Sequence, residues 1–294
     1  MNDKDLIQND FRSYLAYEKG LSSNSVNAYI RDALLFKEFF KDKSLLEINY
    51  YDILEYLSYL YDQQIKRSSQ ARKISSLKTF YQMLVDKGYV ESNAFEKVVV
   101  AKKEQKLVDV IEYDTIMNFL NSFSESTLDI RNKALFELLY ATGLRVSEVA
   151  SLKVSDLDFE NNLIKVIGKG SKERIVIFSD HTKTTLKKYL NQSRVILNEK
   201  DLKDLFLNNK GDALSVRGIQ FVLKDKWSKL IYEQKINPHQ FRHSFATHLL
   251  ANGMDLKTLQ ELLGHQSLST TQIYTKVSNT LLSKAVNTLE IDLD

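Results

Sequence analysis

Apolar residues recur at the spacing of amphipathic helices through residues 1–98. In the first run, Leu6, Phe11, Leu15 and Tyr17 form one apolar face. Capping residues and glycines mark the expected starts and stops of the helices: Gly20, Ser22 or Ser23, Asp52, Ser68 or Ser69, and Gly88. The pattern therefore predicts a domain of four helices over residues 1–98.

Residues 99–108 lack the helical period and are rich in lysine and valine, which favours an extended basic linker. Beyond it, residues 109–294 again show mostly helical spacing. β-branched residues fill 163–167 and 174–178 on either side of a glycine-flanked turn, so these segments predict a β-hairpin. Lys169 in this turn could swing into a neighbouring site or be an ordinary exposed lysine. The chain is expected to be mainly α.

A tight junction between two helices is predicted early in the second domain. The first helix runs from Thr127 to Tyr140, and Gly143 is its expected left-handed stop. Arg145 then opens the next helix, beside backbone N–H groups that favour an anion. A surface ion pair with Glu148, one helical turn away, would explain Arg145 equally well.

The helix that begins at Asn237 and Pro238 has a capping residue followed by proline at its first position, and it runs to about Ala251. His239 and Arg242 share its first turn, near the positive end of the helix dipole. Further helices are expected at 183–197, 216–231, 256–263 and 281–289.

Composition excludes several kinds of site. The 294 residues include no cysteine, so thiol nucleophiles, disulfides and Cys-ligated zinc are absent. No apolar run approaches the ~18 residues of a membrane span, and the polar, acidic N-terminus is unlike a signal peptide. We therefore expect a cytoplasmic protein without a membrane partner.

The net charge of +3 does not by itself indicate a nucleic-acid partner, but the cations are clustered. The fourth predicted helix carries five basic residues and no acid between its first turn and its middle: Lys66, Arg67, Arg72, Lys73 and Lys78. With serines and a glutamine between them, these residues suit a DNA-binding face. An ordinary solvated basic face would show the same pattern.

A set of polar groups in the second domain would serve one reaction: Arg145, Lys169, His239, Arg242, His265 and Tyr274. Phosphodiester cleavage needs a nucleophile, neutralisation of the phosphate oxygens and a proton for the leaving oxygen. Guanidinium groups bind phosphate, a histidine can accept the phenol proton, and a lysine can protonate the leaving oxygen. Because cations would neutralise the charge, we expect no metal ion and no cofactor.

Four segments resemble the motifs of the tyrosine recombinases, and among these most closely the Xer subfamily of XerC and XerD: ATGLRVSEV (141–149), IGKGSKER (167–174), PHQFRHSFATHLL (238–250) and LLGHQSLSTTQIYTKV (262–277). Two further segments resemble the core-binding domain of that family: EKGLSSNSVNAYIRDALLFKEFF (18–40) and SSQARKISSLKTFYQML (68–84). The similarity covers nearly the whole chain, and its four motifs occur in the family's order.

The resemblance implies a role for each candidate residue. Arg145 and Arg242 would clamp the phosphate, and His265 would donate a further hydrogen bond to it. Tyr274 would be the nucleophile and form a 3′-phosphotyrosyl bond.

The remaining candidates would handle protons and orientation. Lys169 resembles the general acid that protonates the 5′-oxygen, and His239 resembles the proton acceptor. Glu148 would orient its neighbours from behind the phosphate clamp. His243 points off the face of Arg242, so a structural role is expected for it.

The resemblance also implies a fold and an assembly. A four-helix SAM-like core-binding domain (1–98) and an α-rich catalytic domain with a small sheet (109–294) would form a C-shaped clamp around double-stranded DNA. A homo- or hetero-tetramer, with or without a sister Xer recombinase, would exchange strands between two duplexes. The C-terminal tail helix would contact a neighbouring protomer or fold back on its own domain. The implied duty is resolution of chromosome dimers at a dif-like site during cell division, with an FtsK-type translocase as a further partner.

Three other functions fit parts of the pattern. An integrase of a phage or mobile element often adds an N-terminal arm-binding domain, for which helices that start near residue 5 leave no room. A type IB topoisomerase shares the chemistry, but the short Xer-like N-terminal domain argues against it. A non-catalytic DNA-binding protein would not need all six site residues.

Overall fold

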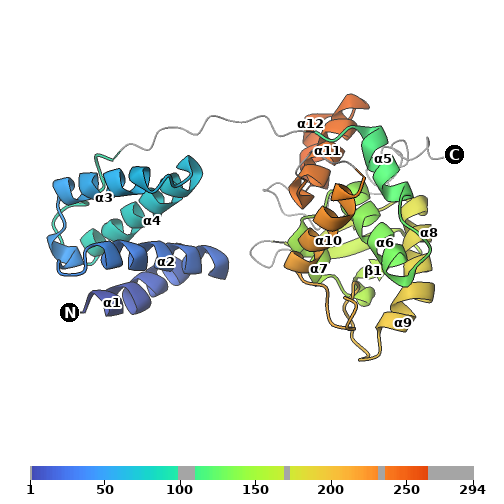
Figure 1. The fold of residues 1–294 in the computed structure, drawn as a ribbon, viewed down its shortest axis with the longest axis horizontal. Helices are drawn as coiled ribbons and strands as arrows, with labels where there is room; N and C mark the ends of the chain where they lie inside the picture. Colours follow the sequence, from blue (N-terminus) through green and yellow to red (C-terminus); the bar gives the residue numbers. More distant parts are fainter. Residues whose placement is uncertain (1, 99–109, 169–172, 231–235, 264–294) are drawn as a thin grey trace. The chain divides into compact units, whose positions relative to one another are not determined.

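The computed structural model describes residues 2–98, 110–168, 173–230 and 236–263, and the chain divides into two units, Met1–Lys106 and Leu107–Asp294 (Figure 1). Each unit has its own hydrophobic core. The predicted linker at 99–108 lies outside the described residues, so its extended form stays a prediction. Helices dominate both units, which confirms the mainly α class.

The N-terminal unit is helical throughout: α1 (Asp3–Asp5), η1 (Leu6–Phe11), η2 (Tyr14–Glu18), α2 (Ser23–Phe39), η3 (Leu45–Glu47), α3 (Tyr50–Asp62) and α4 (Arg67–Asp86). Aromatic rings fill its core. Phe36 on α2 packs edge-on against Tyr56 on α3 and Tyr81 on α4, with ring centroids 4.8 and 6.3 Å away. The Tyr81 hydroxyl donates to the carbonyl of Leu45 at 2.8 Å. This core holds α2 and α4 side by side.

Several predicted helix boundaries in this unit need correction. Ser22 caps α2, as one of the two expected serines. Asn49 caps α3, whereas Asp52 lies in its first turn and accepts from the Asn49 N–H at 2.7 Å. α4 starts at Arg67, before the predicted serines. Tyr17 is 86% exposed instead of buried, because the wider turns of η1 and η2 depart from the ordinary helical spacing.

The C-terminal unit contains more helices around one small sheet: α5 (Tyr113–Asn121), α6 (Thr127–Thr142), α7 (Val146–Ser151), η4 (Val154–Asp156), α8 (Asp180–Lys188), η5 (Tyr189–Arg194), α9 (Val195–Leu197), α10 (Val216–Ser228), α11 (Pro238–Ala251) and α12 (Leu256–Leu262). Almost every residue of α6 is buried. This helix packs against α5, α7, α8, η5 and α11 (Figure 1). It is the central element on which the candidate site is built.

The sheet has three antiparallel strands in the order β1 (Leu157–Asp158), β2 (Leu163–Ile167) and β3 (Glu173–Ile177). Ile164 on β2 faces Val176 on β3, and both side chains are buried. The predicted hairpin is confirmed. β1 was not predicted, because two residues are too few to show the alternation of a strand.

Other boundaries in this unit also shift. The helix predicted at 183–197 starts at Asp180, where Ser179 caps it by accepting from the Thr182 N–H at 3.1 Å. Val195, at the end of this segment, is 64% exposed, next to the wide turns of η5. Gly143 ends α6 in the left-handed conformation, with φ +59°, as expected. Among the described helices, none is long and apolar enough to cross a membrane.

Candidate active site

A capping box fixes the start of α11, the helix that carries two of the predicted site residues. The Asn237 side chain accepts from the His239 N–H at 3.0 Å, and the Gln240 side chain accepts from the Asn237 N–H at 2.8 Å. Pro238 occupies the first helical position. His239 and Arg242 therefore share the first turn, as predicted, and the His239 side chain is exposed.

Arg242 ties this turn to two other segments. Its Nη1 donates to the Gly143 carbonyl at 2.6 Å, and its Nη2 donates to the Leu263 carbonyl at 2.8 Å. Burial, together with the nearby positive charge of Arg145, lowers the pKa of Arg242 to about 10. The guanidinium still carries its charge at neutral pH. Arg242 thus brings the start of α11 beside the junction that ends in Arg145.

Glu148 organises that junction. Its carboxylate is 5% exposed and accepts the Arg145 backbone N–H at 2.8 Å and the Arg145 Nη1 at 3.0 Å. Arg174 on β3 forks onto the same carboxylate, with both Nη atoms 2.8 Å from its oxygens. Burial alone would raise the pKa of Glu148, but the hydrogen bonds from Arg174 and Arg145 lower it to about 2. Glu148 is a buried anchor, which corrects the alternative of an ordinary surface pair.

The charges of this cluster do not balance among the described residues. Three guanidinium groups, those of Arg145, Arg174 and Arg242, influence one another electrostatically. Glu148 is the one carboxylate in the described part of the chain that hydrogen bonds to them. The cluster therefore carries two positive charges in excess. Because the Arg145 side chain is 38% exposed, this excess can attract an anion from solution.

Arg174, which completes the cluster around Glu148, was not among the site residues predicted from the sequence. Its side chain is only 13% exposed, although it is the second residue of its strand. The alternation of side chains along β3 could have indicated that Arg174 is buried, because Arg174 and Val176 lie on the same face of the strand and Val176 is buried. A charged residue on a buried face needs a partner, and Glu148 supplies it.

Three predicted site residues lie outside the described residues, namely Lys169, His265 and Tyr274. Their assignments stay predictions. The chain around them is described up to Gly168 and from Glu173 in the hairpin, and up to Leu263 after α12. His265 follows two residues after the carbonyl that Arg242 holds. No group of three or more metal-ligating side chains occurs within the part of the chain that the structure describes.

The basic residues of α4 do not all lie on one solvated face. Lys66, Arg67 and Lys78 are exposed. Lys73 is 8% exposed, and its Nζ lies 3.5 Å from a carboxylate oxygen of the buried Asp32. This corrects the prediction that Lys73 belongs to an exposed DNA-binding face, because helical spacing turns position 73 toward α2.

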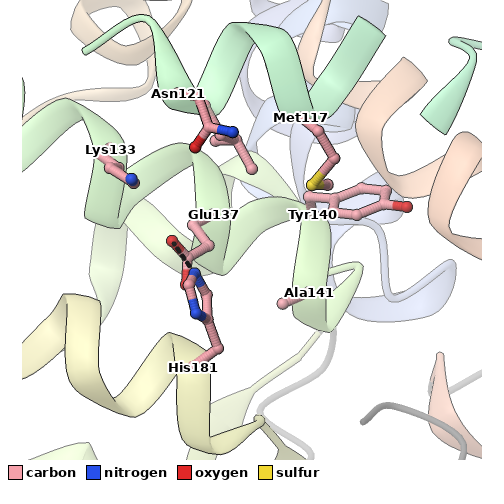
Figure 2. Close-up of a pocket in the computed structure, with 8 residues that line it drawn as sticks. Met117, Asn121, Lys133, Glu137, Tyr140, Ala141 and His181 are labelled. Carbon is pink, nitrogen blue, oxygen red and sulfur yellow. Dashed lines mark ion pairs between the residues drawn. The ribbon is translucent and has the colours of Figure 1, made fainter. Parts of the chain in front are cut away.

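A small cavity between α5, α6 and α8 is separate from the arginine cluster. It measures about 20 Å³, and its lining mixes apolar side chains with the polar groups of Asn121, Lys133, Glu137 and His181 (Figure 2). The His181 Nε2 lies 3.6 Å from a carboxylate oxygen of Glu137, and burial raises the pKa of Glu137 to about 7. Since the cavity has room for about one water molecule, it is no substrate site.

Comparison with known families and proteins agrees with this geometry. Residues 106–280 match the model of the phage integrase family, and residues 9–88 match the model of the phage integrase N-terminal SAM-like domain. A tyrosine recombinase XerC of Leptospira interrogans is 41% identical over 91% of this chain and 88% of its own. A tyrosine recombinase XerD of Oceanobacillus iheyensis is 40% identical over 93% of this chain and 94% of its own.

A solved structure is also similar. The XerH site-specific recombinase, in a post-cleavage complex with a palindromic difH substrate, aligns with a TM-score of 0.69 and 26% identity. The alignment covers 95% of this chain and 84% of that one.

Proposed function

Since this chain belongs to the phage integrase family of tyrosine recombinases, which cut and rejoin DNA at specific sites, we propose that its arginine cluster holds the scissile phosphate and that Tyr274 attacks it. The observation that carries this assignment is the charge imbalance around Glu148. One carboxylate faces three guanidinium groups, of which Arg145 is partly exposed. A phosphodiester is the anion whose paired oxygens suit such forked donors.

The proposed reaction exchanges one phosphoester bond for another, so it needs no external energy source. The Tyr274 oxygen bonds to phosphorus and the bond from phosphorus to the 5′-oxygen breaks, which leaves a 3′-phosphotyrosyl bond. His239 takes the phenol proton and Lys169 supplies a proton to the leaving 5′-oxygen. Arg145, Arg242 and His265 stabilise the negative charge on the phosphate oxygens.

Rejoining reverses the same chemistry. A 5′-hydroxyl from another strand attacks the phosphotyrosine, and Tyr274 is released with its proton restored. One ester bond replaces another in both directions, so no nucleotide cofactor is needed.

A Xer-type duty on the chromosome fits the relatives best. The similarity to relatives named XerC and XerD supports resolution of chromosome dimers at a dif-like site of double-stranded DNA. The similar XerH recombinase, whose solved complex holds a difH substrate, points the same way. We propose a tetramer on two duplexes, formed alone or with a sister recombinase, with an FtsK-type translocase as a further partner.

Suicide-substrate trapping tests this function. A duplex with a candidate dif-like site and a nick close to the cleavage position loses its short 5′-hydroxyl fragment, so a covalent adduct accumulates. We expect the adduct with the wild-type chain, also in the presence of a metal chelator, and its loss in Tyr274→Phe. Tyr17→Phe, a change at an exposed tyrosine of the other unit, is the matched control and should keep the adduct. An adduct that persists in Tyr274→Phe would exclude this nucleophile.

A further inference from the structure

Asp32 is a fully buried acid on α2 that faces three residues of α4. Its side chain is 1% exposed. One carboxylate oxygen, Oδ2, accepts from the Ser76 hydroxyl at 3.1 Å and from Nη1 of Arg72. The other, Oδ1, lies 3.5 Å from the Lys73 ammonium. Burial of a carboxylate is costly without such partners, so this arrangement requires an explanation.

The two basic partners of Asp32 differ in exposure. The Lys73 side chain is 10% exposed and neutralises Asp32 from within the domain. The Arg72 side chain is 43% exposed. Among the described residues, only its Nη1 has a protein partner, so the rest of the guanidinium is left at the surface. With Lys73 balancing Asp32, the charge of Arg72 is in excess.

The surface around Arg72 is basic and polar. Ser68 and Ser75 are exposed one helical turn before and after Arg72 on α4, and the exposed Lys78 follows one turn after Ser75. No acidic residue occurs in the sequence between Lys66 and Gln82. An arginine on such a face is normally mobile, and binding would have to immobilise it. A tether to Asp32 removes part of that entropy cost in advance.

We propose that Asp32 is a positioning residue for DNA recognition. It holds Arg72 so that the free edge of the guanidinium can donate two hydrogen bonds to DNA. The matching acceptor pair is either two phosphate oxygens or O6 and N7 of a guanine. Lys73 is the internal counter-ion and touches no DNA. This inference rests on the proposed function, because it takes duplex DNA as the ligand.

A change that keeps the net charge separates this role from simple electrostatics. Removing an acid from a DNA-binding domain ordinarily tightens DNA binding, since the domain becomes more positive. If Asp32 positions Arg72, its removal weakens binding instead. Asp32→Asn alone leaves Lys73 buried without a charged partner, so the main variant is Asp32→Asn with Lys73→Met. This pair keeps the net charge and the approximate side-chain volumes.

The experiment uses the full chain and a duplex selected by the wild type from a library with a randomised centre. Fluorescence anisotropy gives Kd, and urea unfolding confirms that each variant is folded. We expect Asp32→Asn with Lys73→Met to weaken binding about tenfold. Glu38→Gln removes an exposed acid from the same helix and should bind as tightly as the wild type or slightly more tightly. Arg72→Lys, which keeps the charge but lacks the fork, should weaken binding like the double variant.

The outcomes separate the two proposals. A wild-type chain that selects and binds no duplex overturns the proposed function itself. A wild type that binds while the folded double variant binds equally well or better overturns the role of Asp32 alone. If Arg72→Lys loses affinity only for duplexes with one particular guanine, the acceptor is a base edge. Equal loss on all duplexes assigns it to a phosphate.

Discussion

Replacement of Glu148 by glutamine tests whether one buried carboxylate holds the arginine cluster together. Glutamine keeps the size of the side chain but removes the charge and presents an NH₂ group to donors. Two arginines then compete for a single acceptor oxygen, and the Arg174 guanidinium, 13% exposed, loses its charged partner. The guanidinium groups then repel one another more strongly, at the place where a phosphate clamp needs fixed geometry.

The pKa of Glu148 gives the size of the effect. The difference between its ordinary value of 4.5 and about 2 in the folded chain corresponds to ~3 kcal/mol of preferential stabilisation of the ionised form. Because the folded pKa is lowered, this stability is fully present above pH 4.5 and is lost as the pH falls toward 2. Glu148→Gln should therefore reduce the free energy of unfolding by ~3 kcal/mol at neutral pH, and by progressively less in acid.

Urea unfolding at neutral pH and at about pH 3 measures the loss of unfolding free energy at both pH values. Glu173→Gln on β3 is the control, since its ion pair with Lys165 is half exposed on both sides and its loss should cost under ~1 kcal/mol. Single-turnover cleavage should fall in the folded Glu148→Gln chain. Equal unfolding free energies for the two variants at neutral pH would refute the anchoring role.

Three further changes probe other parts of the C-terminal unit. Glu137→Gln should stabilise the chain at about pH 8 and have little effect at about pH 4. The folded pKa of Glu137 is about 7, so ionisation of this acid opposes folding above its ordinary pKa. Urea unfolding at both pH values measures the difference. Gly143→Ala should cost ~1–3 kcal/mol more than Gly20→Ala in the same assay, since both glycines have φ +59° but only at Gly143 would the new methyl lie 2.6 Å from a Phe245 atom. In Arg242→Lys, the lysine has no fork with which to bond both carbonyls, so the rate of single-turnover cleavage at saturating protein should fall ~100-fold or more. Cleavage at the wild-type rate would exclude Arg242 as a phosphate clamp.

Local signals in the sequence predicted the parts of the fold that depend on neighbouring residues. Asn237 and Pro238 start α11 and Gly143 ends α6, because caps and left-handed stops are decided within one turn of chain. The hairpin follows equally from its β-branched runs. Helical spacing placed Leu6, Phe11 and Leu15 correctly in the core but misplaced Tyr17, which lies in the wider turn of η2.

The contacts that set the electrostatics are tertiary, and spacing alone did not reveal them. Arg174 reaches Glu148 across 26 positions of sequence, and Asp32 meets Ser76 across 44. The expected exposure of Lys73 was wrong because a basic run looks the same on a solvated face and beside a buried acid. A charged residue at a position whose strand or helix neighbours are apolar is the sequence feature that points to such partners.

Mass spectrometry of the trapped adduct tests the catalytic assignment most directly. After nuclease and trypsin digestion of the wild-type complex, the nucleotide should be found on the peptide of residues 258–276, attached to Tyr274 through a 3′-phosphate. A nucleotide attached to any other residue would contradict Tyr274 as the nucleophile, and a linkage through the 5′-phosphate would contradict the proposed 3′-phosphotyrosyl bond.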